Sequence, residues 1–123
     1  MKPLGYWLNR TDQALTAHMD RTLAEFGLTR VAWQMLNVIK SGADFSELQA
    51  NADATTLGTT FDTLVADGWT TREPTLTPEG RARLTDVAER IATFRERSMA
   101  GISPDDYRTT IGVLERITAN LDR

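Results

Sequence analysis

The sequence predicts a mainly α-helical fold with one small β-hairpin. Apolar residues recur at spacings of three, four and seven along most of the 123 residues, which is the period of amphipathic helices. Residues that start and stop helices separate these stretches from one another. One threonine-rich stretch, residues 69–76, lacks the helical period and contains Pro74. A short hairpin is the best interpretation of that stretch.

Composition predicts one soluble, cytoplasmic domain. Hydrophobic residues make up 41% of the chain and charged residues 25%, which is the ordinary globular range. There is no cysteine, so disulfides and zinc-thiolate sites are excluded. No apolar run approaches the length that spans a bilayer, so we expect no membrane partner. We also expect no metal and no cofactor. The net charge of −3 gives no global attraction for nucleic acid.

Two helices are predicted in the first third of the chain. The first covers residues 3–26 and ends at Gly27. A second helix follows Thr29, which can cap it, and ends at Ser41-Gly42. The apolar stripe of the first helix consists of Leu4, Trp7, Leu8, Leu15, Met19, Leu23 and Phe26, and that of the second consists of Ala32, Met35, Leu36 and Ile39.

Two shorter helices are predicted before the hairpin. Asp44, with Glu47 three residues later, resembles a capping box for a short helix over residues 45–51. The next helix starts near Asp53 and stops at Asp67-Gly68. Its apolar residues fall at i, i+4, i+7 and i+8, so they share one buried face: Leu57, Phe61, Leu64 and Val65.

Two helices complete the chain, and each opens with a cap residue followed by proline. Thr77-Pro78 starts one and Ser103-Pro104 starts the other. A tri-helical core followed by a hairpin is the winged helix-turn-helix arrangement. We therefore predict a single domain with a winged-helix core at 29–77 and flanking dimerisation helices at 3–26 and 78–123.

Five segments carry a resemblance to the multiple-antibiotic-resistance regulator (MarR) family of bacterial transcription factors. They cover nearly the whole chain, and their order and spacing are more specific than any one of them. In chain order they are GYWLNRTDQAL, GLTRVAWQMLNVI, LVADGW, LTPEGRARL and AGISPDDYRTTIGVLERITANL. The resemblance implies a homodimer that binds double-stranded DNA, with a small aromatic effector as a further partner.

The chain departs from the family pattern in two places. Only WTTREPTL joins the helices where the family has a longer wing with a basic tip, and Arg72 is its sole basic residue. From Ser41 to Thr71 the chain has no basic residue. It has five acidic ones there: Asp44, Glu47, Asp53, Asp62 and Asp67. The two elements expected to touch DNA are thus electrostatically the poorest part of the protein.

Candidate DNA-reading residues lie on the helix that follows Asp53. Opposite its apolar face the helical period places Thr55, Thr56, Thr59, Asp62, Thr63 and Ala66. Threonine hydroxyls can bond phosphates or base edges, and Asp62 could accept a hydrogen bond from cytosine. Candidate phosphate contacts are Arg72, Arg30 and Lys40, followed by Arg81 and Arg83. The alternative is that these are solvated threonines on a helix that has lost its nucleic-acid role.

Candidate ligand-binding residues come from the first two helices. In the resembling family, effectors bind between the winged core and the dimerisation helices, where the corresponding residues are Tyr6, Trp7, Arg10, His18 and Trp33. An apolar cleft with a few polar groups would suit an aromatic or phenolic compound. The alternative is that the aromatic residues belong to the core, as they usually do at helical spacing.

No catalytic residue is predicted. His18 is the only histidine, no serine lies in a nucleophile motif, and there is no phosphate-binding glycine loop. The leading hypothesis is a dimeric MarR-like regulator. The alternative is a ligand-binding or protein-interaction module on the same scaffold that has lost DNA binding. An enzyme built on this scaffold stays open only because a fold does not fix a function.

Overall fold

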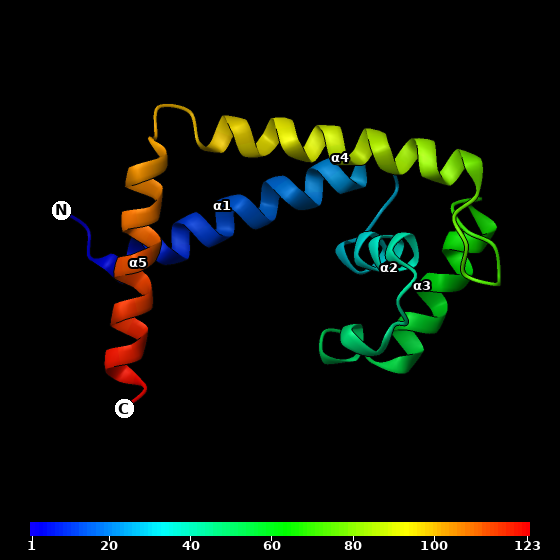
Figure 1. The fold of residues 1–123 in the computed structure, drawn as a ribbon, viewed down its shortest axis with the longest axis horizontal. Helices are drawn as coiled ribbons and strands as arrows, with labels where there is room; N and C mark the ends of the chain where they lie inside the picture. The colour runs from blue at the N-terminus through cyan, green and yellow to red at the C-terminus, as the bar shows by residue number, and fades with distance from the viewer. The chain divides into compact units, whose positions relative to one another are not determined.

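The computed structural model describes residues 1–123 and is mainly α-helical, as predicted (Figure 1). Its element order is that expected from the sequence, with one difference in helix type, since the short helix before residue 51 is a 3-10 helix. The elements are α1 (Leu4–Ala24), α2 (Arg30–Ser41), η1 (Ser46–Ala50), α3 (Ala54–Ala66), α4 (Pro78–Ser98) and α5 (Pro104–Leu121). The chain forms two compact units, Met1–Ile91 and Ala92–Arg123.

Side-chain caps fix the starts of four helices. Each cap oxygen accepts a hydrogen bond from the backbone N–H three residues later, which satisfies a donor that the helix itself cannot. The caps are Thr29, Asp53, Thr77 and Ser103, with donor–acceptor distances of 3.2, 2.7, 2.8 and 3.0 Å respectively. The sequence predicted Thr29, Thr77 and Ser103 as caps, and it predicted a helix start near Asp53 without assigning a cap there.

Two glycines end helices in the left-handed conformation. Gly42 follows α2 with a φ of 78°, and Gly68 follows α3 with a φ of 84°. Only glycine adopts this conformation without strain from a Cβ atom. The Ser41-Gly42 and Asp67-Gly68 stops predicted from the sequence are therefore confirmed.

The predicted capping box at Asp44 is wrong. The Asp44 carboxylate accepts from the backbone N–H of Ser46 at 2.9 Å and from its hydroxyl at 2.5 Å. The residue that directly precedes η1 is Phe45, so Asp44 lies one position too early to cap it. It forms instead a local turn with the residue two positions on.

The predicted hairpin is reduced to a single antiparallel bridge between Thr70 and Leu76. Two backbone hydrogen bonds flank this bridge, from Thr71 N–H to the Thr75 carbonyl at 2.9 Å and from Thr77 N–H to the Trp69 carbonyl at 3.1 Å. The buried Thr70 hydroxyl also donates to the Thr75 carbonyl at 3.1 Å. Five residues between the bridge partners, one of them Pro74 without an N–H group, leave too little chain for a ladder. We call residues 71–75 the wing turn.

All buried apolar residues lie between Leu23 and Ile91, in the first unit. Within that unit α2 packs against α1, η1 and α3. Leu57 and Leu64 turn inward from α3, with Phe61 and Val65 half-buried beside them, as predicted. The core members are Leu23, Leu28, Ala32, Met35, Leu36, Ile39, Leu48, Leu57, Leu64, Trp69, Leu76, Leu84, Val87 and Ile91.

The start of α4 is packed directly onto the end of the α3 segment. A Cβ atom on Gly80 would lie 2.0 Å from the carbonyl oxygen of Trp69. The Thr77 hydroxyl donates to the Gly68 carbonyl at 2.6 Å. Trp69 itself is 1% exposed. The wing turn is therefore held at both ends by the core, although its own residues are exposed.

The second unit contains the end of α4 and the whole of α5, and none of its residues is buried. In α5 the apolar side chains at the surface include Tyr107, Ile111, Val113 and Leu121. The first half of α1, in the other unit, is also exposed, with Trp7 54% exposed. No helix is both long and apolar enough to cross a membrane.

Candidate nucleic-acid interface

The predicted reading face of α3 is exposed along its length. Thr55, Thr56, Thr59, Asp62 and Thr63 all lie at the surface. The Thr63 hydroxyl donates to the Thr59 carbonyl at 3.1 Å, and its lone pairs remain available. The face offers hydroxyl groups and one carboxylate, with no basic side chain on the helix. Such a face can form hydrogen bonds to base edges but contributes little attraction to phosphate.

The wing turn brings its one cation onto this helix. Arg72 Nη1 donates to Asp62 Oδ1 at 2.5 Å, and both side chains are about two-thirds exposed, at 66% and 62%. The Arg72 guanidinium also lies 5.9 Å from the centre of the Phe61 ring. The sequence had suggested separate roles for Asp62 and Arg72, yet the structure makes them partners. Phe61 was expected only as a core residue.

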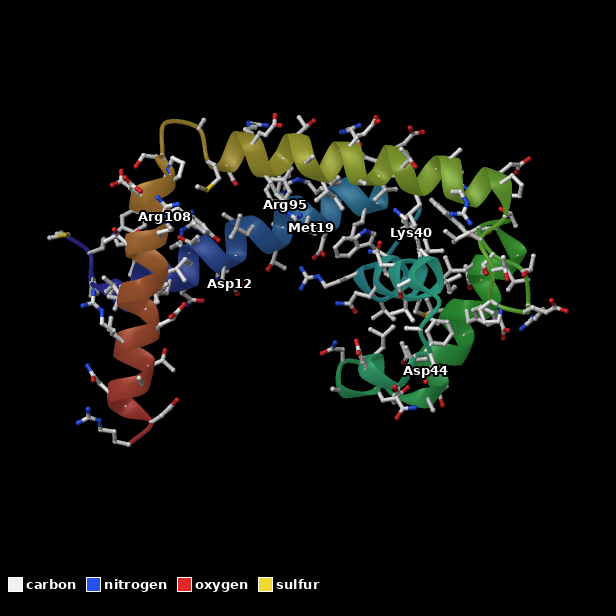
Figure 2. The ribbon with its side chains drawn as sticks, in the orientation of Figure 1. Asp12, Met19, Lys40, Asp44, Arg95 and Arg108 are labelled. Carbon is white, nitrogen blue, oxygen red and sulfur yellow. The ribbon has the colours of Figure 1, made fainter.

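The other candidate phosphate contacts have different surroundings. Arg30 forms an exposed salt bridge with Asp20 at 3.5 Å. Lys40 lies in the last turn of α2 (Figure 2) and forms no salt bridge. Arg83 stacks on Trp69, with its guanidinium 3.9 Å from the ring centre, and donates to the Phe26 carbonyl at 3.4 Å. Arg83 is thus a packing residue, while Lys40 has no carboxylate partner in the structure.

Two of the acidic residues around this face are held in their charged form. The Ser46 hydroxyl and N–H donate to Asp44 and lower the pKa of that carboxyl. The Thr56 backbone N–H lowers the pKa of Asp53. Hydrogen bonds to a carboxylate favour the ionised form. At neutral pH these acids therefore oppose the approach of a polyanion.

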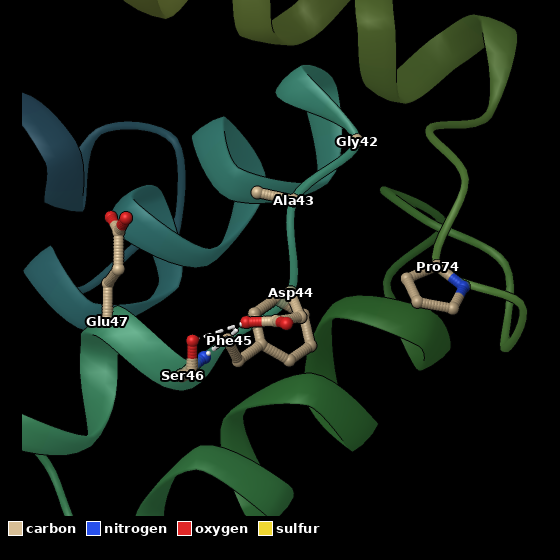
Figure 3. Close-up of a pocket in the computed structure, with 7 residues that line it drawn as sticks. All are labelled: Gly42, Ala43, Asp44, Phe45, Ser46, Glu47 and Pro74. Atoms are coloured by element: carbon tan, nitrogen blue, oxygen red, sulfur yellow. Dashed lines mark hydrogen bonds between the residues drawn. The ribbon is translucent and has the colours of Figure 1, made fainter.

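A surface hollow of about 630 Å³ adjoins the wing turn. Its lining comes from the segment between α2 and η1 together with Pro74 (Figure 3). Asp44 and Ser46 are bonded to each other at its edge. No sequence pattern predicted this hollow, because Pro74 is remote in sequence from the other residues that line it.

The predicted ligand residues occupy two kinds of environment. Tyr6 and Trp7 are exposed on α1 and contact each other edge to face at 5.1 Å, and Arg10 is exposed nearby on the same helix. His18 and Trp33 are half-buried, and Trp33 packs against the core. Another hollow of the first unit lies between Asp20 and Val31 and is lined by none of these five residues. Their role in binding an effector stays a prediction.

No protein-family model matches the sequence, and no curated protein is similar to it at a significant level. Solved structures do match. The MarR family protein Rv2887 of Mycobacterium tuberculosis, solved in complex with salicylic acid, is 26% identical, with a TM-score of 0.67 over 95% of this chain and 99% of that one. The same protein in complex with DNA gives a TM-score of 0.74 at 24% identity over 95% and 98%.

Two further structures extend the similarity to other proteins. The transcriptional regulator PA3341 is 26% identical over 98% of both chains, with a TM-score of 0.71. Reduced MarR of E. coli is 21% identical over 95% of this chain and 94% of that one, with a TM-score of 0.70. The fold is therefore shared along nearly the whole chain with proteins of the MarR family and with a further transcriptional regulator.

Proposed function

We propose that this chain, a member of the MarR family of transcriptional regulators, binds double-stranded DNA as a homodimer and presents α3 to the major groove. One observation carries the proposal: α3 exposes a row of hydroxyl side chains at the position where a winged helix-turn-helix domain places its reading helix. The similarity to a protein solved with DNA, over 95% of this chain, supports it. The structural neighbours are transcriptional regulators rather than enzymes.

Base reading falls to threonine hydroxyls and methyl groups. Thr55, Thr56, Thr59 and Thr63 can donate or accept hydrogen bonds at base edges, and a threonine methyl group can contact that of thymine. Each lost base contact costs about 1–3 kcal/mol of specific binding. This face selects by shape and hydrogen bonds, since it has no basic side chain of its own.

Phosphate contacts come from few groups. Lys40, Arg30 and Arg72 are the candidates, and two of them already have a carboxylate partner. With roughly two to four phosphate contacts per subunit, the dimer should show a log–log salt slope of about −4 to −7. The existing ion pairs place the expected slope at the shallow end of that range.

Exposed apolar side chains support the proposed homodimer. The first half of α1 and the whole of α5 expose leucine, isoleucine, tyrosine and tryptophan side chains. A symmetric second copy would bury both stripes. Residues 3–26 and 78–123 are thereby proposed as the dimerisation helices of one MarR-like domain, with residues 29–77 as its DNA-binding core.

A small aromatic effector is proposed to modulate DNA binding. The similarity to a protein solved with salicylic acid supports this partner. Tyr6, Trp7, Arg10, His18 and Trp33 are the proposed ligand residues, since they combine aromatic surface with polar groups. Titration of phenols and aromatic acids should quench tryptophan fluorescence and raise the melting temperature. A broad panel with neither effect would remove support for this partner.

The decisive experiment is a DNA-binding titration. Fluorescence anisotropy with duplexes tiled across the DNA beside the coding region should find at least one duplex bound more tightly than an unrelated duplex. Thr59→Ala and Thr63→Ala should each weaken that complex by about 1 kcal/mol or more. Lack of binding to every duplex at low salt would contradict the proposal.

The alternative function is a ligand-binding or protein-interaction module that has lost DNA binding. The observation in its favour is electrostatic. The sole cation of the wing turn is paired with Asp62, and the five acidic residues from Ser41 to Thr71 have no basic residue among them in the sequence. Effector binding without DNA binding at low salt would favour this module.

A further inference from the structure

We infer that Asp62 is a positioning residue for Arg72, and that it holds the wing turn's guanidinium against α3 for contact with DNA instead of reading a base itself. The inference rests on the proposed DNA-binding function and deepens it. It starts from the ion pair at 2.5 Å between Asp62 Oδ1 and Arg72 Nη1. An isolated aspartate on this helix would repel phosphate, whereas the charge of an aspartate paired with arginine is offset by its partner.

The contacts of Arg72 come from two consecutive residues of α3. Asp62 accepts its hydrogen bond, and the ring of Phe61 lies 5.9 Å from the guanidinium carbon. Phe61 in turn contacts Phe45 at a ring distance of 5.8 Å and packs against the core. The guanidinium is therefore held by a helix surface that is itself fixed.

The wing turn has little else to hold its tip. Two backbone hydrogen bonds close its base, from Thr71 N–H to the Thr75 carbonyl and from Thr77 N–H to the Trp69 carbonyl. The threonine hydroxyls of residues 70, 71 and 75 donate only to carbonyls of the wing turn itself, and none of them contacts the Arg72 side chain. Arg72, Glu73 and Pro74 are all exposed. A flexible arginine side chain loses rotamer freedom when it binds. The pair with Asp62 removes part of that freedom before DNA arrives.

The geometry leaves Arg72 able to bind a second anion. A guanidinium carries five N–H donors in a fixed plane, and Asp62 accepts from Nη1 alone. The remaining donors can reach a phosphate oxygen while the pair persists. The Asp62 oxygen that accepts from Arg72 is, by contrast, engaged and less available to cytosine. Arg72 is thus the DNA contact and Asp62 its support.

The test compares two aspartates of the same helix segment. Asp62→Asn and Asp67→Asn each replace a carboxylate by an amide of the same shape and remove one negative charge. Asp67 is exposed and forms no salt bridge. Asp67→Asn should bind every duplex as tightly as the unmodified protein or more tightly. Asp62→Asn should bind up to about fivefold more weakly, the scale of an exposed ion pair, with the same base preference.

The same substitution in an Arg72→Ala background should have the opposite sign. With the arginine gone, Asp62 only repels phosphate, so Asp62→Asn should then tighten binding. Asp62→Glu should restore most of the affinity, because a carboxylate one methylene longer can still pair with arginine. If Asp62 reads cytosine, Asp62→Asn changes base preference in both backgrounds, and the inference is overturned. If Asp62 is merely repulsive, it behaves as Asp67 does, which also overturns it.

A readout without DNA separates this inference from the proposed function. The side-chain ¹⁵Nε order parameter of Arg72 should fall in Asp62→Asn, stay unchanged in Asp67→Asn and recover in Asp62→Glu. Equal order parameters in all variants would show that Asp62 does not restrict the Arg72 side chain. Failure of the unmodified protein to bind any duplex overturns the proposed function and the role in DNA binding together. DNA binding with identical behaviour of the two asparagine variants overturns the positioning role alone.

Discussion

The segment from Leu23 to Ile91 and the helix α5 show opposite ways of using apolar residues. The first contains every buried apolar side chain of the protein, including Trp69 and Leu64 at 1% and 2% exposure. The second repeats the helical pattern faithfully but buries nothing. In proteins most of the stability of a helix comes from the packing of its apolar face. The core of the first unit is therefore held together by its own contacts, whereas the apolar stripe of α5 is the surface that we propose a second copy of the chain covers.

The largest expected effect comes from adding one methyl group in the core of the first unit. Gly80→Ala places a Cβ 2.0 Å from the Trp69 carbonyl oxygen, and backbone cannot move aside as a flexible side chain does. We expect a loss of about 3 kcal/mol or more in the free energy of unfolding, the upper range for overpacking. Urea denaturation followed by circular dichroism measures it.

Gly58→Ala is the matched control for that substitution. Gly58 lies within α3, and its added Cβ would meet nothing within 4 Å. Alanine favours the helix over glycine by about 0.5–1 kcal/mol, so the control should be slightly more stable. Equal behaviour of the two variants would contradict the close packing of α4 on Trp69.

The second prediction concerns the apolar stripe of α5. Leu114→Glu together with Ile117→Glu places two charges within the apolar stripe of α5, where both side chains are half-buried in the single chain. Each substitution removes the apolar side chain that the proposed interface would bury. We therefore expect dimerisation to weaken by about 3 kcal/mol or more, roughly 100-fold. Sedimentation velocity at micromolar concentration should show a monomer whose winged-helix core remains folded.

Thr109→Glu with Asn120→Glu provides the control for α5. Both residues are exposed and lie outside the stripe that Ile111, Leu114 and Leu121 form on this helix. This variant carries the same added charge but should remain a dimer. A monomeric unmodified protein, or equal dissociation of both variants, would contradict the assignment of α5 to the interface.

The third prediction concerns a contact that links elements within the first unit. Arg83 stacks on Trp69 and donates to the Phe26 carbonyl. Arg83→Ala should lower the free energy of unfolding by about 1 kcal/mol, the sum expected for an exposed cation–π contact and a weak hydrogen bond. Arg81→Ala, two residues away and without an ion pair, should change thermal stability by less than about 0.5 kcal/mol. Equal melting temperatures would remove this role of Arg83.

The sequence predicted the helices well because their limits are encoded locally. Cap residues such as Thr29 and stop residues such as Gly42 act on the few residues beside them. They mark the same helix limits as the period of the apolar positions does. Asp44 shows the limit of that reasoning, since a shift of one residue turned a predicted cap into a local turn. The exposure of the α3 threonines followed from the same period and needed no tertiary information.

The pairings of the site could not be read from local patterns. Asp62 and Arg72 lie ten residues apart, on a helix and in a turn, and the turn geometry alone decides whether they meet. The approach of Gly80 to Trp69 likewise depends on how α4 leaves the turn. The sequence analysis named both members of this ion pair but assigned them independent roles, because charge and spacing do not reveal a partner across a turn.

The smallest expected effect is at the start of α3, where the local signal was strongest. The Asp53 carboxylate accepts from the Thr56 N–H at 2.7 Å, and this bond lowers the pKa of Asp53 in the folded protein. A lowered folded-state pKa means that the cap stabilises the helix above the ordinary aspartate pKa and that the stabilisation is lost as the pH falls through the lowered value.

Acid titration should therefore loosen the first turn of α3 only below about pH 4. The ¹³C shift of the Asp53 carboxyl should titrate with a midpoint below that of an unfolded peptide. Exchange of the Thr56 amide, corrected for its intrinsic pH dependence, should accelerate over the same interval. Asp53→Ala should show the fast exchange already at pH 7, while Asp44→Ala, in a separate turn, should leave the α3 amide unchanged. A midpoint at or above the peptide value would mean that the charged form gains nothing from the cap, and the electrostatic part of helix initiation would then have to come from elsewhere.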